Sequence, residues 1–232
     1  MDFTEARRFM VDGQIRPNKV TDPRILDAMR EVPRERFVPP ALAFRVMADA
    51  DTPLRDGRVM MQAMTLARLL QSAAVLPGQR VLVVAAGTGY SAAVLRHIGA
   101  EVVALESNPE LLAAARANLA MPAEGSMASA AAAPVRVESG PLAEGWAAAA
   151  PYDAILIDGA VDAIPPALRD QLAEGGRIVG VIRAAGGAGR AVLARRTHGS
   201  FGLTETFDAQ TARLPDFAAA AAPAPAGAFQ FV

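Results

Sequence analysis

The chain has 232 residues, and its 23 basic and 24 acidic side chains leave a formal net charge of −1. This balance provides no basic footprint for nucleic acid, so nucleic acid is not an expected partner. The absence of cysteine excludes disulfides, thiolate nucleophiles and Cys-ligated metals. The acidic N-terminus lacks the apolar stretch of a signal peptide, and no uncharged run of 18 apolar residues predicts a membrane span. We expect a cytoplasmic protein without a membrane partner, and no His, Asp and Glu spacing indicates a metal site.

Residues 1–75 precede the first predicted strand of the main sheet and form an N-terminal segment that is mostly helical. Asp22 followed by Pro23 is a favourable helix start, with an N-cap residue and proline at the first helical position. Apolar residues from Met60 to Leu70 recur at helical spacing. We expect this segment to lie on the substrate side of the core.

From residue 76 to residue 217, strands and helices alternate, which predicts an α/β fold with a mostly parallel sheet. The predicted strands are 81–84, 101–106, 135–137, 152–158 and 177–182. Helices are expected from Asn108 to about Ala120 and from Pro165 to Gly175. Residues 191–194 and 203–207 then follow without a long helix between them, which predicts an antiparallel C-terminal hairpin. Residues 122–134 are an expected surface insertion, and 218–232 an Ala/Pro-rich tail.

The stretch from Arg80 to Leu95 is the one around which the function is organised. Its apolar strand runs into a small-residue turn and then into a helix, whose free N–H groups and dipole favour a polar or anionic ligand. Glu106 ends the next strand, 19 residues after Gly87, a spacing that suits ribose hydroxyls. Gly87-x-Gly89-x-x-Ala92 also fits a dinucleotide loop, so NAD stays open. The preceding helical segment and the antiparallel end favour S-adenosylmethionine instead.

Several further motifs occur in a fixed order along the chain: DPRILDAM at 22–29, VPRERFVP at 32–39, GTGYSAAVL at 87–95, GW at 145–146, APYDAI at 150–155, IPPAL at 164–168, GGRIV at 175–179 and LPDF at 214–217. With these motifs the chain resembles the protein-L-isoaspartate O-methyltransferase family over about residues 5–217. The resemblance implies a Rossmann-like class I methyltransferase sheet. It also implies methyl transfer from S-adenosylmethionine to an isoaspartyl carboxylate in a protein or peptide acceptor, and a small-molecule acceptor stays open.

The candidate site residues fall into three groups. Those expected to bind the cofactor are Ala85, Gly87, Thr88, Gly89, Tyr90, Glu106, Ser107, Gly140, Pro141 and Leu142. On the substrate side, the resemblance implies Val59, Met60, Met61 and Gln62, although the methionines also suit a core. Asp158 ends the fourth strand, where ligands bind in open α/β sheets, and is the candidate catalytic residue. Its alternative role is to cap the following turn.

The chain departs from the family's pattern at functional positions. Val83 stands where the family usually has an acid, Ala85 replaces a glycine, and Pro141 replaces an aspartate. Val59 and Met61 replace hydroxyl side chains. A positive φ at Ala85 would cost about 1–2 kcal/mol. These departures predict weakened cofactor binding and weak or absent isoaspartyl activity, and they keep open a catalytically inactive binding or assembly module.

Overall fold

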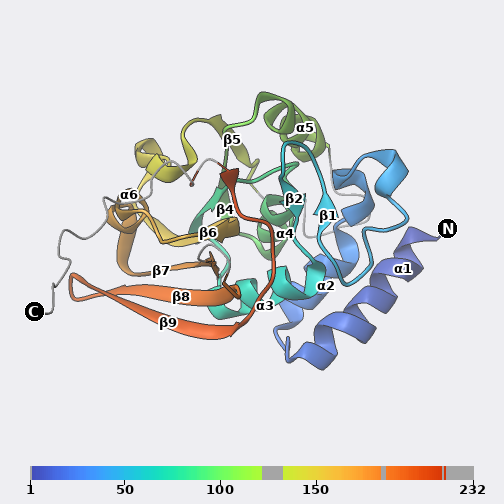
Figure 1. The fold of residues 1–232 in the computed structure, drawn as a ribbon, viewed down its shortest axis with the longest axis horizontal. Helices are drawn as coiled ribbons and strands as arrows, with labels where there is room; N and C mark the ends of the chain where they lie inside the picture. The colour runs from blue at the N-terminus through green and yellow to red at the C-terminus, as the bar shows by residue number, and fades with distance from the viewer. Residues whose placement is uncertain (1, 122–132, 184–186, 216, 218–232) are drawn as a thin grey trace, which may run out of the picture.

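The computed structural model describes residues 2–121, 133–183, 187–215 and 217, and within them a seven-stranded sheet has the order β5-β4-β3-β6-β7-β8-β9. Strands β5 through β7 pair in parallel, and β8 and β9 are antiparallel to their neighbours. The predicted mostly parallel sheet with an antiparallel C-terminal hairpin is therefore confirmed (Figure 1). The strands of this sheet are β3 (Arg80–Val84), β4 (Glu101–Glu106), β5 (Arg136–Ser139), β6 (Tyr152–Val161), β7 (Leu172–Ile182), β8 (Arg190–Thr197) and β9 (Ser200–Asp208).

Two apolar layers cover the sheet, because its central strands are apolar on both faces. Val81 and Val83 of β3 pack into one cluster, while Leu82 and Val84 pack into the other. The first cluster contains residues of α3 (Ala63–Ala73), α4 (Tyr90–Ile98) and α5 (Pro109–Ala120). The second contains residues of the short helices η6 (Leu142–Glu144) and α6 (Pro166–Asp170).

The N-terminal segment adds helices to the first cluster and lies to the right in Figure 1. Asp22 caps α2 by accepting the N–H of Arg24 at 2.9 Å, as predicted. The helix expected from Met60 begins at Ala63, because Val59 and Met60 form a strand instead. The elements of this segment are α1 (Phe3–Met10), η1 (Val11–Ile15), η2 (Arg16–Asn18), α2 (Pro23–Glu31), η3 (Arg34–Phe37), η4 (Pro40–Leu42), β1 (Thr52–Pro53) and β2 (Val59–Met60).

The helix expected from Pro165 to Gly175 is wrong in length. It ends at Asp170, and β7 begins at Leu172 and runs through both Gly175 and Gly176. The cause is pairing with β6, since the N–H of Tyr152 donates to the Gln171 carbonyl and Tyr152 pairs with Leu172. Sheet pairing here overrides the tendency of the two glycines to end an element. The expected surface insertion (apart from 133 and 134) and the tail lie outside the described residues.

The chain after β9 runs back over the carboxyl end of β6 (red in Figure 1). Arg213 forms a parallel bridge with Ala160, and the N–H of Ala160 donates to Ala212 at 3.0 Å. The Thr211 hydroxyl donates to Asp51 at 2.7 Å. This connection ties the C-terminal end of the sheet to the segment before β1. Among the described helices, none is both long and apolar enough to cross a membrane.

Candidate functional site

The loop between β3 and α4 has the strand-turn-helix form that the sequence predicts. Three of its residues have positive φ: Ala85 at 65°, Gly87 at 58° and Gly89 at 97°. A Cβ on Gly89 would lie 2.9 Å from a methyl carbon of Leu119, so glycine permits the close approach of α5. The Thr88 hydroxyl donates to the Phe37 carbonyl at 2.6 Å, which fixes the loop against the N-terminal segment.

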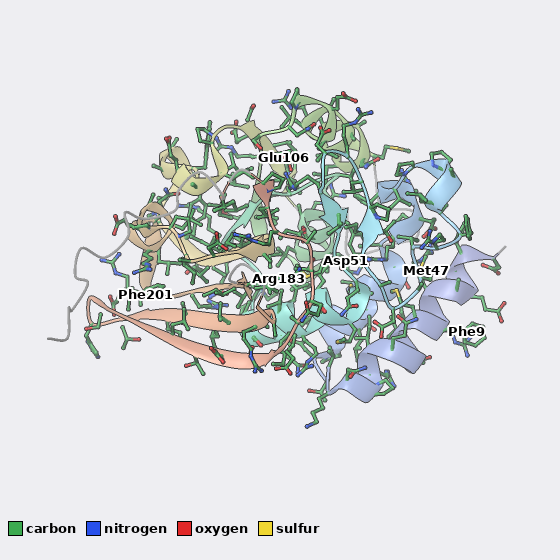
Figure 2. The ribbon with its side chains drawn as sticks, in the orientation of Figure 1. Phe9, Met47, Asp51, Glu106, Arg183 and Phe201 are labelled. Atoms are coloured by element: carbon green, nitrogen blue, oxygen red, sulfur yellow. The ribbon has the colours of Figure 1, made fainter. Side chains whose placement is uncertain are left out.

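Glu106, labelled in Figure 2, lies at the end of β4 and is completely buried. Both of its oxygens accept hydrogen bonds. Oε1 accepts from Arg58 Nη1 at 2.9 Å and from the N–H groups of Ser107 and Asn108 at 3.0 Å each. Oε2 accepts from Arg58 Nη2 at 3.0 Å and from the N–H of Gly87 at 2.7 Å. A carboxylate offers about four lone-pair sites. Five protein donors occupy these sites in this structure, two of them from Arg58, and the ribose contact that the sequence predicts stays a prediction.

Arg58 is the residue that sequence reasoning missed. It lies 48 positions before Glu106, a separation to which no spacing rule applies, and its side chain is 5% exposed. Nη2 also donates to the carbonyl of Ala85 at 2.8 Å. The turn between β1 and β2 holds Arg58 in place, because its N–H donates to Arg55 and its carbonyl accepts from Leu54. The signal for this ion pair in the sequence is the opposite charge of Arg58 and Glu106, which many other pairs of residues share.

Asp158 lies on the other side of the loop, at an irregularity in β6 between Leu156 and Ala160. Its half-buried carboxylate accepts the hydroxyl of Ser91, in the first turn of α4, at 2.6 Å. Burial raises the pKa of Asp158 to about 6, against the lowering effects of the Ser91 hydrogen bond and the Arg58 charge. An acid with this pKa can exchange a proton near neutral pH. The structure thus brings Asp158 to the loop, and its catalytic role stays a prediction.

The predicted substrate side contributes fewer exposed groups than expected. Met60 and Met61 are buried in the core, and the Met61 carbonyl accepts from Arg34 at 2.6 Å. Val59 is half-buried, and the N–H of Gln62 donates to Asp51 at 2.9 Å. Of the two roles open to Met60 and Met61, core packing matches their positions, and the substrate role of Val59 stays a prediction.

The remaining cofactor candidates divide between loop and core. The Tyr90 side chain is buried against the N-terminal segment, and its hydroxyl donates to the Met29 sulfur at 3.2 Å. Leu142 is buried in the second core cluster. Gly140 follows β5, whose last residue Ser139 pairs with Glu106. Of the predicted set, Gly87 and Ser107 donate backbone N–H groups to Glu106.

A small cavity next to this end of β4 is lined by Asp56, Arg58, Ser107, Asn108 and Pro215. Its volume is about 210 Å³, below the roughly 300–1,000 Å³ of ligand pockets. While Arg58 engages Glu106, and with proline at position 141 supplying no N–H, this cavity alone is too small for an adenosyl group. Within the described ranges, no group of three or more His, Asp or Glu side chains is placed to hold a metal ion.

Comparison with known proteins gives a consistent result. The family model described as protein-L-isoaspartate(D-aspartate) O-methyltransferase matches residues 6–207. The chain is 42% identical to a protein-L-isoaspartate O-methyltransferase of Methylorubrum extorquens, over 86% of this chain and 84% of that protein. It is 37% identical to the same-named protein of Gloeobacter violaceus, over 85% of this chain and 93% of the relative.

Solved structures agree on the fold. A protein-L-isoaspartate O-methyltransferase structure aligns with a TM-score of 0.74 and 23% identity, covering 90% of this chain and 65% of the other. A second structure, a Plasmodium falciparum protein in complex with S-adenosyl-L-homocysteine, aligns at 0.70 and 17%, covering 90% and 98%. With the family model spanning most of its length, the chain belongs to the protein-L-isoaspartate(D-aspartate) O-methyltransferase family.

Proposed function

We propose that this chain is an S-adenosylmethionine-dependent methyltransferase that esterifies the carboxylate of isoaspartyl residues in protein or peptide acceptors. The observation that carries the proposal is the family match over residues 6–207. Relatives that cover more than four-fifths of this chain have that activity as their name. The loop with Gly87 and Gly89, and an acid at the end of β4, lend support because both are at the positions expected for a nucleoside cofactor.

The acceptor chemistry requires little from the protein beyond positioning. A carboxylate is already ionised at neutral pH, so the reaction needs no strong base, and catalysis comes mainly from alignment of the reacting groups. We assign Asp158 as the candidate group beside the acceptor, because it lies next to the loop and its pKa is raised to about 6. When protonated, it can donate a hydrogen bond to an acceptor carboxylate, and when ionised, it repels that carboxylate.

The test is transfer of labelled methyl groups from S-adenosylmethionine to an isoaspartyl peptide. The matched control is the same peptide with an ordinary aspartyl residue. We expect slow transfer to the isoaspartyl peptide alone, slow because Val59 and Met61 supply no hydroxyl for the acceptor. Equal labelling of both peptides, or of neither, would contradict the proposal.

A second candidate is a catalytically inactive binding or assembly module on the same fold. The observation in its favour is the saturated carboxylate of Glu106. A thermal shift measurement separates the two, since a ligand at 100 times its Kd stabilises a protein by about 2.7 kcal/mol. Stabilisation by S-adenosylmethionine at millimolar concentration favours the enzyme, and no shift favours the inactive module.

A further inference from the structure

We propose that Arg58 is an internal occupant of the cofactor site, which holds Glu106 in place of a ribose and must withdraw before an adenosyl ligand binds. We call this contact the Arg58 latch. It rests on the proposed function only for the identity of the ligand. The contact itself is a property of the described residues, with both side chains buried and two parallel N–H···O bonds between them.

The two occupants compete because they need the same atoms. A guanidinium donates two parallel N–H bonds to the two oxygens of a carboxylate, and a ribose diol donates through its hydroxyls to the same oxygens. Bonds from either occupant to the carboxylate are charge-assisted, but the guanidinium also brings a positive charge and a planar pair of donors, which a neutral diol lacks. With Gly87, Ser107 and Asn108 also donating, Glu106 cannot serve both occupants at once.

The position of Arg58 also blocks the loop itself. Its Nη2 donates to the Ala85 carbonyl at 2.8 Å, so the guanidinium bridges the end of β4 and the end of β3. That bridge spans the strand ends where nucleoside ligands bind in open α/β sheets. The latch therefore also engages a backbone carbonyl of the loop, in addition to the acid.

The turn that carries Arg58 has the features of a segment that can open. Asp56 and Gly57, the two residues before Arg58, have positive φ values of 52° and 73°. The tip of the turn is held by exposed contacts, from Asn108 to Asp56 at 2.8 Å and from Arg55 to Glu110 at 2.8 Å. Exposed contacts of this kind contribute little to stability. Withdrawal of the turn breaks them at small cost.

The closed state leaves one of its own polar atoms unsatisfied. Nε of Arg58 is buried without a hydrogen-bond partner among the described residues. A buried donor without a partner is destabilising, and contact with water relieves it. The cavity of about 210 Å³ beside Arg58 offers space for the guanidinium to begin moving outward. Hydration of the unsatisfied Nε therefore favours opening, while loss of the ion pair with Glu106 opposes it.

The experiment is calorimetric titration of S-adenosylhomocysteine into the whole chain and three variants. Arg58→Gln removes the charge and the bidentate geometry. Arg58→Lys keeps the charge but loses the two parallel donors of the guanidinium. Arg55→Gln is the matched control, since Arg55 lies three positions earlier on the same turn and pairs with an acid in an exposed contact. Circular dichroism and thermal melting establish that each variant is folded.

We expect Arg58→Gln to bind S-adenosylhomocysteine at least tenfold more tightly than the parent chain, Arg58→Lys to fall between them, and Arg55→Gln to match the parent. The proposal is overturned if folded Arg58→Gln and Arg58→Lys bind no more tightly than the parent. It is also overturned if Arg55→Gln tightens binding as much as Arg58→Gln does.

Methyl transfer to the isoaspartyl peptide separates this proposal from the proposed function. Tighter binding by Arg58→Gln without transfer by any variant supports the latch and contradicts the enzyme. Transfer by the parent chain, with unchanged affinity in Arg58→Gln, supports the enzyme and overturns the latch.

Discussion

Two carboxylates flank the loop after β3, and they differ in burial and in the number of hydrogen bonds that they accept. Glu106 ends β4 with no exposed surface and five protein donors. Asp158, on β6, is half-buried, accepts from Ser91, and has a pKa raised to about 6. Because β4 and β6 both pair with β3, the two acids occupy equivalent places in the sheet. The position in the fold brings an acid to the site, and the donors around it decide whether the acid is available.

The largest expected loss of stability comes from replacing Glu106, the carboxylate that is paired with Arg58. Glu106→Gln leaves the Arg58 cation buried without its counterion and removes acceptor strength from three N–H groups. Removing one partner of a buried pair costs about 3–5 kcal/mol of unfolding free energy. Urea denaturation of parent and variant measures the loss. A loss below about 1 kcal/mol would show that the pair contributes no more than a surface contact.

For Asp158, the carboxylate with the raised pKa, we expect an effect on stability that depends on pH. Asp158 has a folded pKa of about 6 against an ordinary value of 3.8, so its ionised form destabilises the folded state. Relative to Asp158→Asn, the parent loses stability as pH rises from about 4 to 6, and the difference is constant above about 7.

Two pKa units correspond to almost 3 kcal/mol, which partial exposure reduces to about 1–2 kcal/mol. Urea denaturation at pH 4, 5, 6 and 7.5 follows this difference. A gap between parent and Asp158→Asn that is the same at all four pH values would remove the contrast with Glu106.

The loop between the two acids carries a smaller strain. Ala85 has φ of 65°, a conformation in which glycine avoids a steric cost of about 1–2 kcal/mol. Ala85→Gly is therefore expected to stabilise the chain by about 1 kcal/mol, or by about 2–4 °C in Tm. Ala86→Gly is the control, because Ala86 lies outside the positive-φ residues and gains nothing from glycine. Equal effects of the two substitutions on Tm would contradict the strain at Ala85.

The smallest effect is expected at the surface counterpart of the buried pair. Arg55 and Glu110 are separated by 2.8 Å, with side chains 53% and 62% exposed. Arg55→Ala should change the unfolding free energy by less than about 0.5 kcal/mol, because water screens exposed pairs. A loss close to that of Glu106→Gln would mean that burial does not explain the difference between these neighbouring contacts.

Much of the fold was predictable because local patterns and final structure agree. The apolar run at 81–84, the small-residue turn and the following helix gave β3, its loop and α4. Glu106 was placed correctly at the end of β4. Asp158 was expected to end its strand, but β6 continues past it through an irregularity to Val161, where it pairs with β7. The division of the chain at residue 75 stays a prediction, although α3 packs against the central sheet in one core.

The missed features depend on contacts between distant residues. Strands β1 and β2 have two residues each, too few for any alternation to be visible. Arg58 reaches Glu106 through that hairpin, and the pairing of Tyr152 with Leu172 extends β7 through Gly175. The positive φ at Ala85 was predicted only as a condition, because sequence gives the cost of the conformation and not its presence.

The contact between Thr211 and Asp51 has a consequence for the order of folding. These residues are 160 positions apart, and Asp51 also holds the N–H of Gln62 before α3. Long-range closures of this kind are slow, because chain entropy is lost before the contact forms. During synthesis, Asp51 leaves the ribosome long before Thr211 exists, so Asp51, just before the β1–β2 hairpin, completes its contacts only after β9 has been made. A pause or truncation before residue 211 should leave the sheet largely formed and Asp51 without the contacts that it makes with Thr211 and Ala212.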